Sequence, residues 1–508
     1  MGFVLTVAVA APWVAAIVAG VLPAAAGTVA RVAGWVTGVG GLAAVAVGVL
    51  AVFGEQPTAG GWWAGDAVAV LMLLLVLGLS WVIQLFAVRY LRGDARQRWF
   101  AVWANALTGS TVVMVCTGTV LTFTAGWVAA GVSLVFLLGT YRSLPQARQG
   151  VRRTAVSFLI GDAAFLVAIT VLVVSAGGDV RLSELAAATG AIPEAGVILV
   201  AILLVVAALA RSAQLPFHRW LPATLAAPTP VSALLHAGVV NAGAILVIRF
   251  SPLIAPAAVA MAIIFTAGAA TVVYAAAVRM VKPDVKGRLV FSTAGQMGFM
   301  MMAVGLGAFA AAVFHLIAHA LYKSALFLSA GTGVAAHADQ RTWPTPEPAA
   351  RARTVTAMAL AVVVPVVVLV AAKAVVAPQV TAASVALLGF VFFTAAVAVG
   401  TGLARRLTLS TVIAAVAGIT AIGFFYVAFL GLFEHLITPP EPAASVTPWL
   451  LVVPAVLLLA LQLTATRLGR TSPLHRVLYV RTLAASSVPV PPNRRSASIP
   501  RIQKETVS

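Results

Sequence analysis

The 508-residue chain is 62% hydrophobic and only 9% charged, has a formal net charge of +19, and has a mean hydropathy of +1.07. Soluble domains carry about a quarter charged residues and about half apolar ones, so this composition excludes a soluble globular protein and indicates a protein whose solvent is lipid. The single cysteine, Cys116, lies in an apolar run, which excludes a disulfide framework and a thiolate metal cluster.

About fifteen apolar segments are long enough to cross a hydrocarbon core of roughly 30 Å. We therefore predict an all-α integral membrane protein with about 14 to 15 transmembrane helices. The first segment lacks a charged leader, so we read it as a span and not as a cleaved signal peptide. The segments lie near residues 3–27, 32–53, 66–88, 100–118, 120–140, 155–176, 193–214, 229–250, 254–278, 288–306, 308–335, 354–376, 382–404, 408–433 and 447–466.

The chain divides into four regions on this pattern. Residues 1–65 form N-terminal transmembrane helices, 66–376 a helical core, and 377–466 C-terminal transmembrane helices. Residues 467–508 are rich in Arg, Ser and Pro, so we expect a basic, disordered tail.

The basic residues predict the orientation of the chain. With the gaps between segments numbered from the N-terminus, the odd-numbered gaps and the tail hold all but four of the 32 Lys and Arg residues. The exceptions are Arg181, Arg249, Lys323 and Lys373. Basic loops remain in the cytoplasm, so we expect the N-terminus outside the cell and the C-terminus inside. This topology explains the basic surplus without a nucleic-acid partner.

Asp162 is the acid that falls well inside a predicted span, in "FLIGDAAFLVAI". An ionisable group at that depth is costly and usually faces a partner or a water-filled path. We favour a functional or ion-paired role. The alternative is an acid near the interface that pairs with Arg152 or Arg153.

Segment seven and its exit predict a broken helix. Arg211 and His236 flank a run of four prolines, which free backbone carbonyls and are tolerated at membrane depth where a helix lines a cavity or is buried in protein. Because histidine titrates near neutral pH, His236 suits a proton relay, although a buried histidine that only joins helices fits equally well. The four prolines are Pro216, Pro222, Pro228 and Pro230.

Segment eleven reads "FHLIAHALYKSALFLSAG" and places His315, His319 and Lys323 at i, i+4 and i+8. This spacing puts them on one helical face, about 6 Å apart along the axis. We favour a proton relay. A metal site is the weaker alternative, because neither an acid nor a cysteine lies nearby in the sequence. Lys373, near the outer end of segment twelve, is either an exit group or a snorkelling lysine.

Three motifs resemble the antiporter-like subunits of respiratory complex I and of multisubunit cation/proton antiporters. They are "SAQLPFHRWLPATLAAPTPVSALLHAG", "VKPDVKGRLVFSTAGQMGFMMMAVG" and the segment-eleven run, with "GDAAFLVAI" as a further match. The resemblance covers roughly residues 66–376, which would be the proton-conducting core. It implies two inverted five-helix repeats, with segments seven and twelve broken, crossed by a central row of charged residues.

Differences from the complex I pattern indicate which subgroup of that family the chain resembles. Val128 stands where complex I subunits place a glutamate, and Arg211 stands where they place a lysine. The acid usual after "WLP" is replaced by Ala223 and Thr224. The run "HAGVVNAG" also differs from the complex I pattern, and "PFHRWL" followed by "APTPVSALLHAGVVNAG" most resembles the DabB-type membrane subunits of inorganic-carbon accumulation complexes. That resemblance implies a cytoplasmic DabA-type partner, a zinc-binding subunit related to carbonic anhydrases, and no cofactor in this chain.

We therefore expect a subunit in a bacterial plasma membrane that conducts protons or Na⁺ and drives hydration of CO2 to bicarbonate in the partner. The expected path comprises Asp162, Arg211, His236, the segment-eleven triad and Lys373. Two alternatives stay open. One is a proton-pumping subunit of a respiratory, hydrogenase or Mrp-type antiporter complex, against which Val128 and Arg211 count. The other is a membrane anchor without conduction.

Overall fold

The computed structural model describes residues 1–54, 63–331, 351–376, 407–436, 447–467 and 473–486, with short stretches between 388 and 403. The named elements in these ranges are helices, and two isolated β-bridges join loops. The α-helices are α1 (Gly2–Val21), α2 (Ala26–Val52), α3 (Ala67–Tyr90), α4 (Gln97–Cys116), α5 (Val120–Leu138), α6 (Pro145–Ala176), α7 (Leu185–Ala188), α8 (Glu194–Arg211), α9 (Thr229–Ala237), α10 (Ala242–Arg249), α11 (Ser251–Ile254), α12 (Ala258–Val281), α13 (Val285–Gly305), α14 (Phe309–Leu328), α16 (Arg351–Val376), α18 (Leu409–Leu436), α19 (Val452–Arg467) and α20 (Pro473–Ser486). The 3-10 helices are η1 (Gly139–Tyr141), η2 (Leu182–Glu184), η3 (Thr189–Ala191), η4 (His218–Ala226), η5 (Val239–Asn241) and η6 (Pro448–Leu451).

Twelve helical stretches in the described residues are long and apolar enough to cross a membrane. α13 corresponds to the tenth expected span but is not among them, since its first turn carries Lys286 and Arg288. The thirteenth expected span falls largely outside the described residues, and the fifteenth corresponds to η6 and α19. The predicted fold class, an all-α membrane protein, is confirmed.

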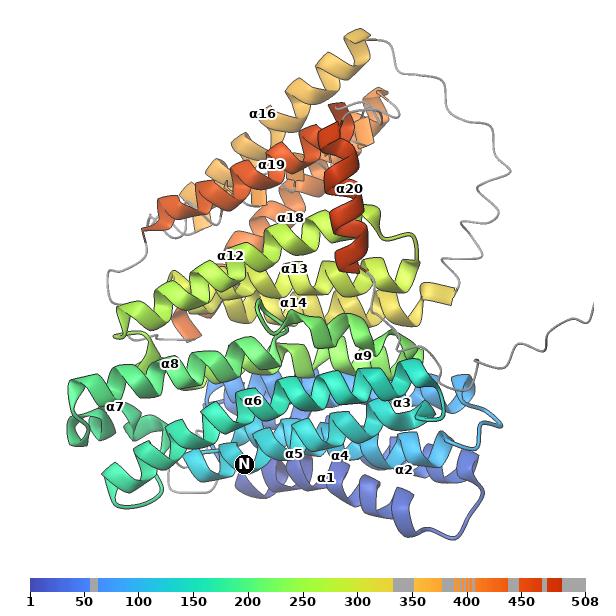
Figure 1. Ribbon diagram of the computed structural model, residues 1–508, viewed down its shortest axis with the longest axis vertical. Helices are drawn as coiled ribbons and strands as arrows, with labels where there is room; N and C mark the ends of the chain where they lie inside the picture. Colours follow the sequence, from blue (N-terminus) through green and yellow to red (C-terminus); the bar gives the residue numbers. More distant parts are fainter. Residues whose placement is uncertain are drawn as a thin grey trace, which may run out of the picture.

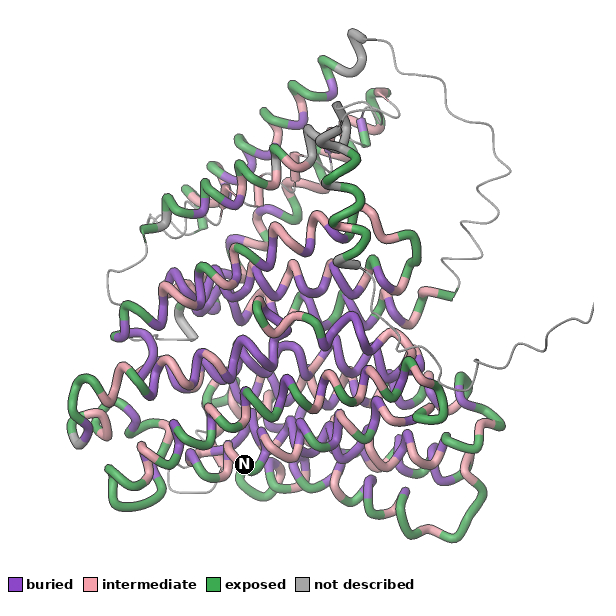
Figure 2. The backbone as a smooth tube through the Cα atoms, in the orientation of Figure 1, coloured by how far each residue is buried: buried purple, intermediate pink, exposed green. Residues whose placement is uncertain are grey.

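The helices stack side by side, with α1 and α2 at the bottom of Figure 1, α12 to α14 in the middle, and α16 and α19 at the top. Burial is greatest in the middle of this stack and along the inner faces of the outer helices (Figure 2). The outer faces expose large apolar side chains, such as Leu159 (70% exposed) and Val174 (74% exposed) on α6. Because apolar groups on this scale need an apolar solvent, these faces are the lipid-facing surface.

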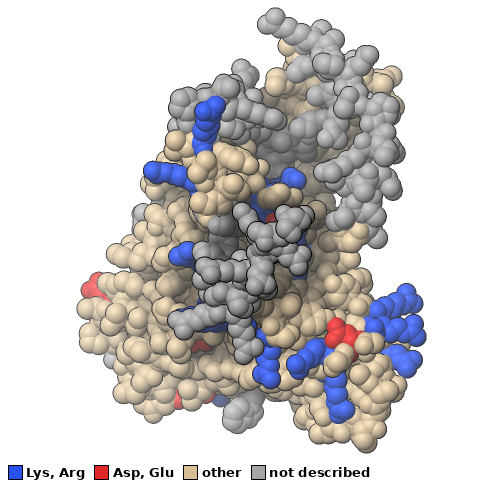
Figure 3. Space-filling model, turned by 45° about the vertical axis from the view of Figure 1, so that its right-hand side comes forward, with Lys and Arg blue, Asp and Glu red and all other residues tan. Residues whose placement is uncertain are grey.

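Contacts near the helix ends join odd-numbered gaps to one another and even-numbered gaps to one another, in agreement with the distribution of basic residues. On the odd-numbered side, Arg98 Nε donates to the carbonyl of Ala19 (2.9 Å), and Lys286 Nζ donates to that of Leu225 (2.9 Å). On the even-numbered side, Arg249 pairs with Asp66, and Thr119 bridges to Arg181. Lys and Arg side chains outnumber acids on the face drawn in Figure 3 and gather at its lower right. The fold therefore has a basic end and an opposite end, as alternating spans require.

Two expectations about the C-terminal part are wrong. Segment twelve is not broken, because α16 runs without interruption through Pro365. A proline removes only one backbone hydrogen bond, a loss that transmembrane helices tolerate. Residues 473–486 of the expected disordered tail form α20, where Pro473 occupies the first helical position and the rest of the helix contains neither glycine nor proline. The rest of the tail beyond 486 lies outside the described residues.

The N-terminal helices α2, α3 and α4 share a buried, uncharged polar cluster. Asn105 Nδ2 donates to Gln84 Oε1 (2.8 Å), and Gln84 Nε2 donates to Ser80 Oγ (3.0 Å). Thr37 donates to Asn105, and the Ser80 and Thr108 hydroxyls lie 2.6 Å apart. We call these five side chains the amide cluster. Each is less than 4% exposed, so their mutual hydrogen bonds replace those that water would supply.

Candidate functional site

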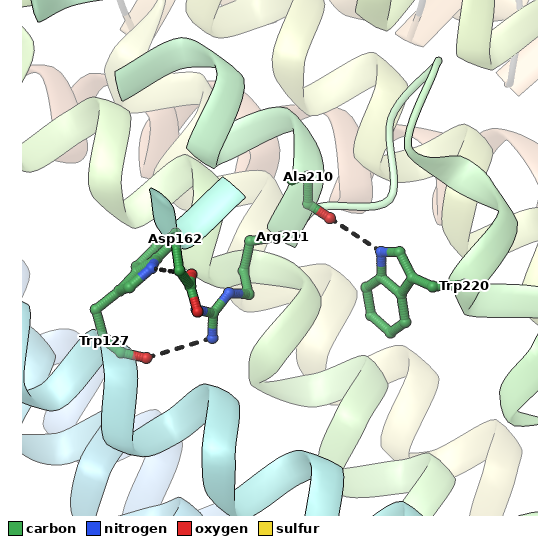
Figure 4. Close-up of polar contacts among 5 residues, drawn as sticks. All are labelled: Trp127, Asp162, Ala210, Arg211 and Trp220. Atoms are coloured by element: carbon green, nitrogen blue, oxygen red, sulfur yellow. Dashed lines mark hydrogen bonds and ion pairs between the residues drawn. The ribbon is translucent and has the colours of Figure 1, made fainter. Parts of the chain in front are cut away.

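An ion pair joins α6 and α8 in the middle of the fold. Arg211 Nη2 lies 2.6 Å from Asp162 Oδ1, and the arginine side chain is only 1% exposed (Figure 4). A buried guanidinium is tolerated only when a carboxylate and further acceptors replace its hydration. Asp162 therefore pairs with Arg211, and its alternative partners Arg152 and Arg153 are not bonded to it among the described contacts.

Trp127 on α5 completes the surroundings of this pair. Its indole Nε1 donates to Asp162 Oδ1 (2.7 Å), and its carbonyl accepts from Arg211 Nη1 (3.3 Å). The guanidinium carbon lies 4.2 Å from the ring centres of both Trp127 and Phe158, a cation–π geometry. Gly131 leaves room for this arrangement, since a Cβ there would lie 2.9 Å from Arg211 Nη1.

Sequence reasoning missed the role of Trp127. The signal was the Gly-Trp pair preceding Val128, where family members place a glutamate. In this chain Asp162 supplies the carboxylate for Arg211, and Trp127 supports both members of the pair. The three residues come from three different helices, so no sequence spacing relates them.

The helical conformation is interrupted after Arg211, as the prolines predict. Ala213 adopts a left-handed conformation (φ 52°), the Leu215–Pro216 peptide bond is cis, and η4 follows with Pro222 inside it. Trp220 Nε1 donates to the carbonyl of Ala210 (2.9 Å), an acceptor freed at the end of α8 (Figure 4). The remaining two prolines, Pro228 and Pro230, start α9.

A second interruption follows His236 and was not predicted. α9 ends at Ala237, η5 covers Val239–Asn241, and α10 resumes at Ala242. Asn241 Nδ2 donates to the freed carbonyl of Ala237 (2.8 Å). Ser212 Oγ donates to the carbonyl of Val240 (2.7 Å), so the break after α8 and the break after α9 lie against each other. The helix-breaking signal was Gly238 within an otherwise apolar span.

His236 is 1% exposed and stacks on Phe327 of α14, with ring centres 4.4 Å apart and planes 12° apart. Neither ring nitrogen has a hydrogen-bond partner within the described part of the chain. A buried imidazole with both nitrogens unpartnered is costly, so this position is suited to water or a transferred proton. The contact also joins α9 to the helix that carries the histidine–lysine triad.

His315, His319 and Lys323 line one face of α14, and α13 supplies their partners. The two imidazole centres are 6.0 Å apart, and His319 Nδ1 lies 3.0 Å from Gln296 Oε1. The Lys323 ammonium donates to the hydroxyl of Ser292 and, at 3.5 Å, to the carbonyl of Leu289. Lys323 is 1% exposed, and no carboxylate among the described residues lies within ion-pair distance of it.

The structure does not bring Lys373 into this row. α16 packs on α18, and α18 packs on α14, so a helix separates Lys373 from the triad (Figure 1). Phe314 of α14 contacts Tyr426 of α18, and Val368 of α16 lies against Gly423 of α18. The assignment of Lys373 as an exit group stays a prediction.

Comparisons with known proteins agree with the resemblance seen in the sequence. Residues 117–397 match the model of the NADH:quinone oxidoreductase/Mrp antiporter transmembrane family, and residues 64–101 match the N-terminal model of complex I chain 5. The chain is 36% identical over 273 residues to the probable inorganic carbon transporter subunit DabB1 of Halothiobacillus neapolitanus, covering 53% of this chain and 49% of that protein.

Two further relatives extend the comparison. The chain is 34% identical to NADH-ubiquinone oxidoreductase chain 5 of Cryptococcus neoformans, over 54% of this chain and 42% of that protein. It therefore spans about half the length of the curated relatives it matches. A solved Mrp complex from Dietzia sp. superimposes with a TM-score of 0.63 at 25% identity, covering 95% of this chain and 57% of the matched chain.

Proposed function

The chain belongs to the NADH:quinone oxidoreductase/Mrp antiporter transmembrane family, and from this premise we propose that it conducts protons or Na⁺ to energise inorganic-carbon accumulation. The observation that supports conduction most strongly is the succession of buried charged and titratable groups beside two helix breaks. Buried ionisable side chains within spans mark ion paths because their desolvation is otherwise uncompensated. The similarity to DabB1 supports the inorganic-carbon assignment.

We assign the parts of the path as follows. Arg211 remains protonated, so with Asp162 it forms a fixed dipole that biases the neighbouring break and carries no proton itself. His236 links this region to α14, where His319, His315 and Lys323 accept and release the ion. Lys373 would lead out of the membrane. Each transferred charge contributes about 2.3 kcal/mol per 100 mV of membrane potential.

We place the partner, a DabA-type zinc-binding subunit related to carbonic anhydrases, on the cytoplasmic face. The basic end of the fold is cytoplasmic under the positive-inside rule, which puts the N-terminus outside the cell. Bicarbonate formed at that face stays in the cell. Within the described residues this chain has no group of three metal-binding side chains, which is compatible with zinc chemistry in a separate subunit.

The test is bicarbonate uptake by bacterial cells that express the chain with its candidate partner, with and without a protonophore. Coupling predicts that the protonophore abolishes uptake if the ion is H⁺, or that a sodium ionophore abolishes it if the ion is Na⁺, while the partner and the chain still co-purify. Bicarbonate uptake that is unaffected by both the protonophore and a sodium ionophore would contradict the coupling proposal. Loss of co-purification without loss of uptake would contradict the proposed partner.

A second candidate is a proton-pumping subunit of a redox complex or a cation/proton antiporter. The match to complex I chain 5 and the likeness to the Mrp complex favour it, whereas Val128 and Arg211 depart from the complex I pattern. Mass spectrometry of proteins that co-purify with the chain separates the candidates. A large zinc protein supports the first, and a set of quinone-oxidoreductase or antiporter subunits supports the second.

A further inference from the structure

A cleft of about 730 Å³ opens between α6 and the break that follows α8. Its size is that of sites for small molecules and cofactors. Four arginines line it, three from α6 and one from η4, and no acid is among the lining residues. They are Arg148, Arg152, Arg153 and Arg219.

The charge of these arginines is uncompensated within the described part of the chain. None of the four takes part in an ion pair there, and the described ion pairs involve other residues. Four guanidinium groups around one cleft repel each other and attract an anion with several oxygen acceptors. A phosphate group meets that requirement, because guanidinium donors match its oxygens in pairs.

The part of the cleft that lies farther along α6 has an apolar wall and faces lipid. Val156 and Ile160 line it and are 51% and 50% exposed. Beyond the cleft, the exposed stripe continues along α6 through Leu159 and Val167. Ser157 also lines the cleft, and its hydroxyl has no hydrogen-bond partner among the described residues. The cleft thus passes from arginines at the basic end to an apolar wall nearer the membrane centre.

We infer that this cleft binds an anionic phospholipid, with the phosphate among the arginines and an acyl chain along Val156 and Ile160. Basic pockets between transmembrane helices on the cytoplasmic side are the expected sites for anionic headgroups. A free phosphate would leave the apolar wall without a function. An acidic peptide from a partner would have no use for a wall that opens to lipid.

The lipid would contact the helix break. Pro216, Phe217 and Trp220 also line the cleft, and Trp220 donates a hydrogen bond to the carbonyl of Ala210, the neighbour of Arg211. Phe158, behind the cleft, contacts both Trp220 (ring centres 5.0 Å) and the Arg211 guanidinium. Occupancy would therefore hold the break in place. Binding does not depend on the proposed function, but any effect of the lipid on ion conduction does.

The experiment compares lipids on the full-length chain purified in a neutral detergent. Phosphatidylglycerol and phosphatidylcholine with the same acyl chains are titrated, and bound lipid is counted by native mass spectrometry alongside the thermal unfolding midpoint. The expected result is saturable retention of phosphatidylglycerol with a raised midpoint, and weak retention of phosphatidylcholine. Equal retention of the two lipids by the wild-type chain would overturn the proposal, whatever the variants do.

Variants and competitors complete the test. The double variant R152Q/R219Q should weaken phosphatidylglycerol retention on the order of tenfold, as expected for the loss of two arginines near an anionic headgroup. The control R89Q/R92Q removes the same charge from exposed positions outside the cleft and should retain the lipid. An equal loss of phosphatidylglycerol retention in both double variants would show that retention depends only on net charge, and would overturn the proposed site. Full displacement by millimolar inorganic phosphate, or cross-linking of a partner's acidic segment in the cleft, would overturn the lipid assignment.

Discussion

Ser212 donates its hydroxyl hydrogen to the carbonyl of Val240 at 2.7 Å, and this bond joins the two places where the central helices are interrupted. The interruption after α8 follows Arg211, and the interruption after α9 follows His236. An interhelical bond between two broken backbones fixes the distance between the two halves of the proposed path. Any step that passes from the ion pair to the histidines depends on that distance.

Ser212→Ala should therefore destabilise the protein and impair conduction together. The Val240 carbonyl would lose its partner in a buried site, at a cost of about 1–3 kcal/mol. Thermal unfolding in detergent and ion flux in proteoliposomes measure the two effects. Thr170→Ala is the matched control, because that hydroxyl is exposed and bonds only within its own helix. Equal behaviour of the two variants would contradict the role of Ser212.

Asp162→Asn should be among the most damaging single changes in the core. It leaves the Arg211 charge buried without a counterion, which costs about 3–5 kcal/mol in comparable pairs. The double variant Asp162→Asn with Arg211→Gln removes both charges and should recover most of the lost stability. Glu184→Gln, an exposed acid, is the control and should unfold like the wild type. A double variant less stable than Asp162→Asn would contradict this account of the pair.

Gly131→Ala should disturb the Asp162–Arg211 ion pair by displacing the Arg211 guanidinium. The added Cβ would meet Arg211 Nη1 at 2.9 Å, so the guanidinium must shift away from Asp162 or Trp127. We expect a lower unfolding midpoint and reduced ion flux. Gly41→Ala provides the comparison, since a Cβ there meets nothing within 4 Å and alanine favours the helix by about 1 kcal/mol. If both alanines stabilise the protein, the space at Gly131 is not needed.

Lys323→Gln should reduce ion flux by at least about tenfold, because it replaces a buried ionisable group in the row with a neutral one. Folding should survive, since the glutamine amide can still donate to Ser292 or Leu289. Lys373→Gln should reduce the flux by a smaller factor, because Lys373, the proposed exit group, lies beyond α18 from the triad. Flux in proteoliposomes under an imposed potential decides both. Unchanged flux in Lys373→Gln would contradict its assignment as the exit group.

The pair between Asp66 and Arg249 should be insensitive to pH in the physiological range. Burial alone would raise the pKa of Asp66, but Arg249 and the backbone donor of Ala69 hold it below the usual 3.8. A lowered pKa gives stability that is present above the unfolded-state pKa and lost as the pH falls through the folded-state value. Asp66→Asn keeps the helix cap and removes the charge. It should lower the unfolding midpoint modestly at pH 7 and by less at pH 3. An equal change at both values would contradict the pair's contribution.

Local signals predicted the parts of this fold that depend on neighbours in sequence. The prolines after Arg211 predicted the first break, and the spacing of His315, His319 and Lys323 predicted one helical face, because both follow from backbone geometry. A functional or ion-paired role was predicted for Asp162, yet the sequence did not identify Arg211 as its partner and left Arg152 and Arg153 as alternatives. Helix packing decides between them, and packing is not a local property.

The features that the sequence did not predict also depend on helix packing. Trp127 and Gln296 contact the ionisable groups from other helices, and their own sequence neighbourhoods do not say which groups they contact. The opposite error occurred at α16. Pro365 is a local signal that favours a helix break, but α16 continues through it without interruption. Gly238 was visible in the sequence, but an isolated glycine in a span is common and carries little information.

The amide cluster of α2, α3 and α4 has a consequence for how the molecule responds to a transmembrane voltage. Its members carry no net charge and do not titrate in the physiological range, so neither the field nor a passing ion alters their bonds. α3 packs on α9 and on α14, which carry His236 and the histidine–lysine triad. The N-terminal helices therefore give the proposed path a supporting frame whose internal hydrogen bonds do not depend on the membrane voltage.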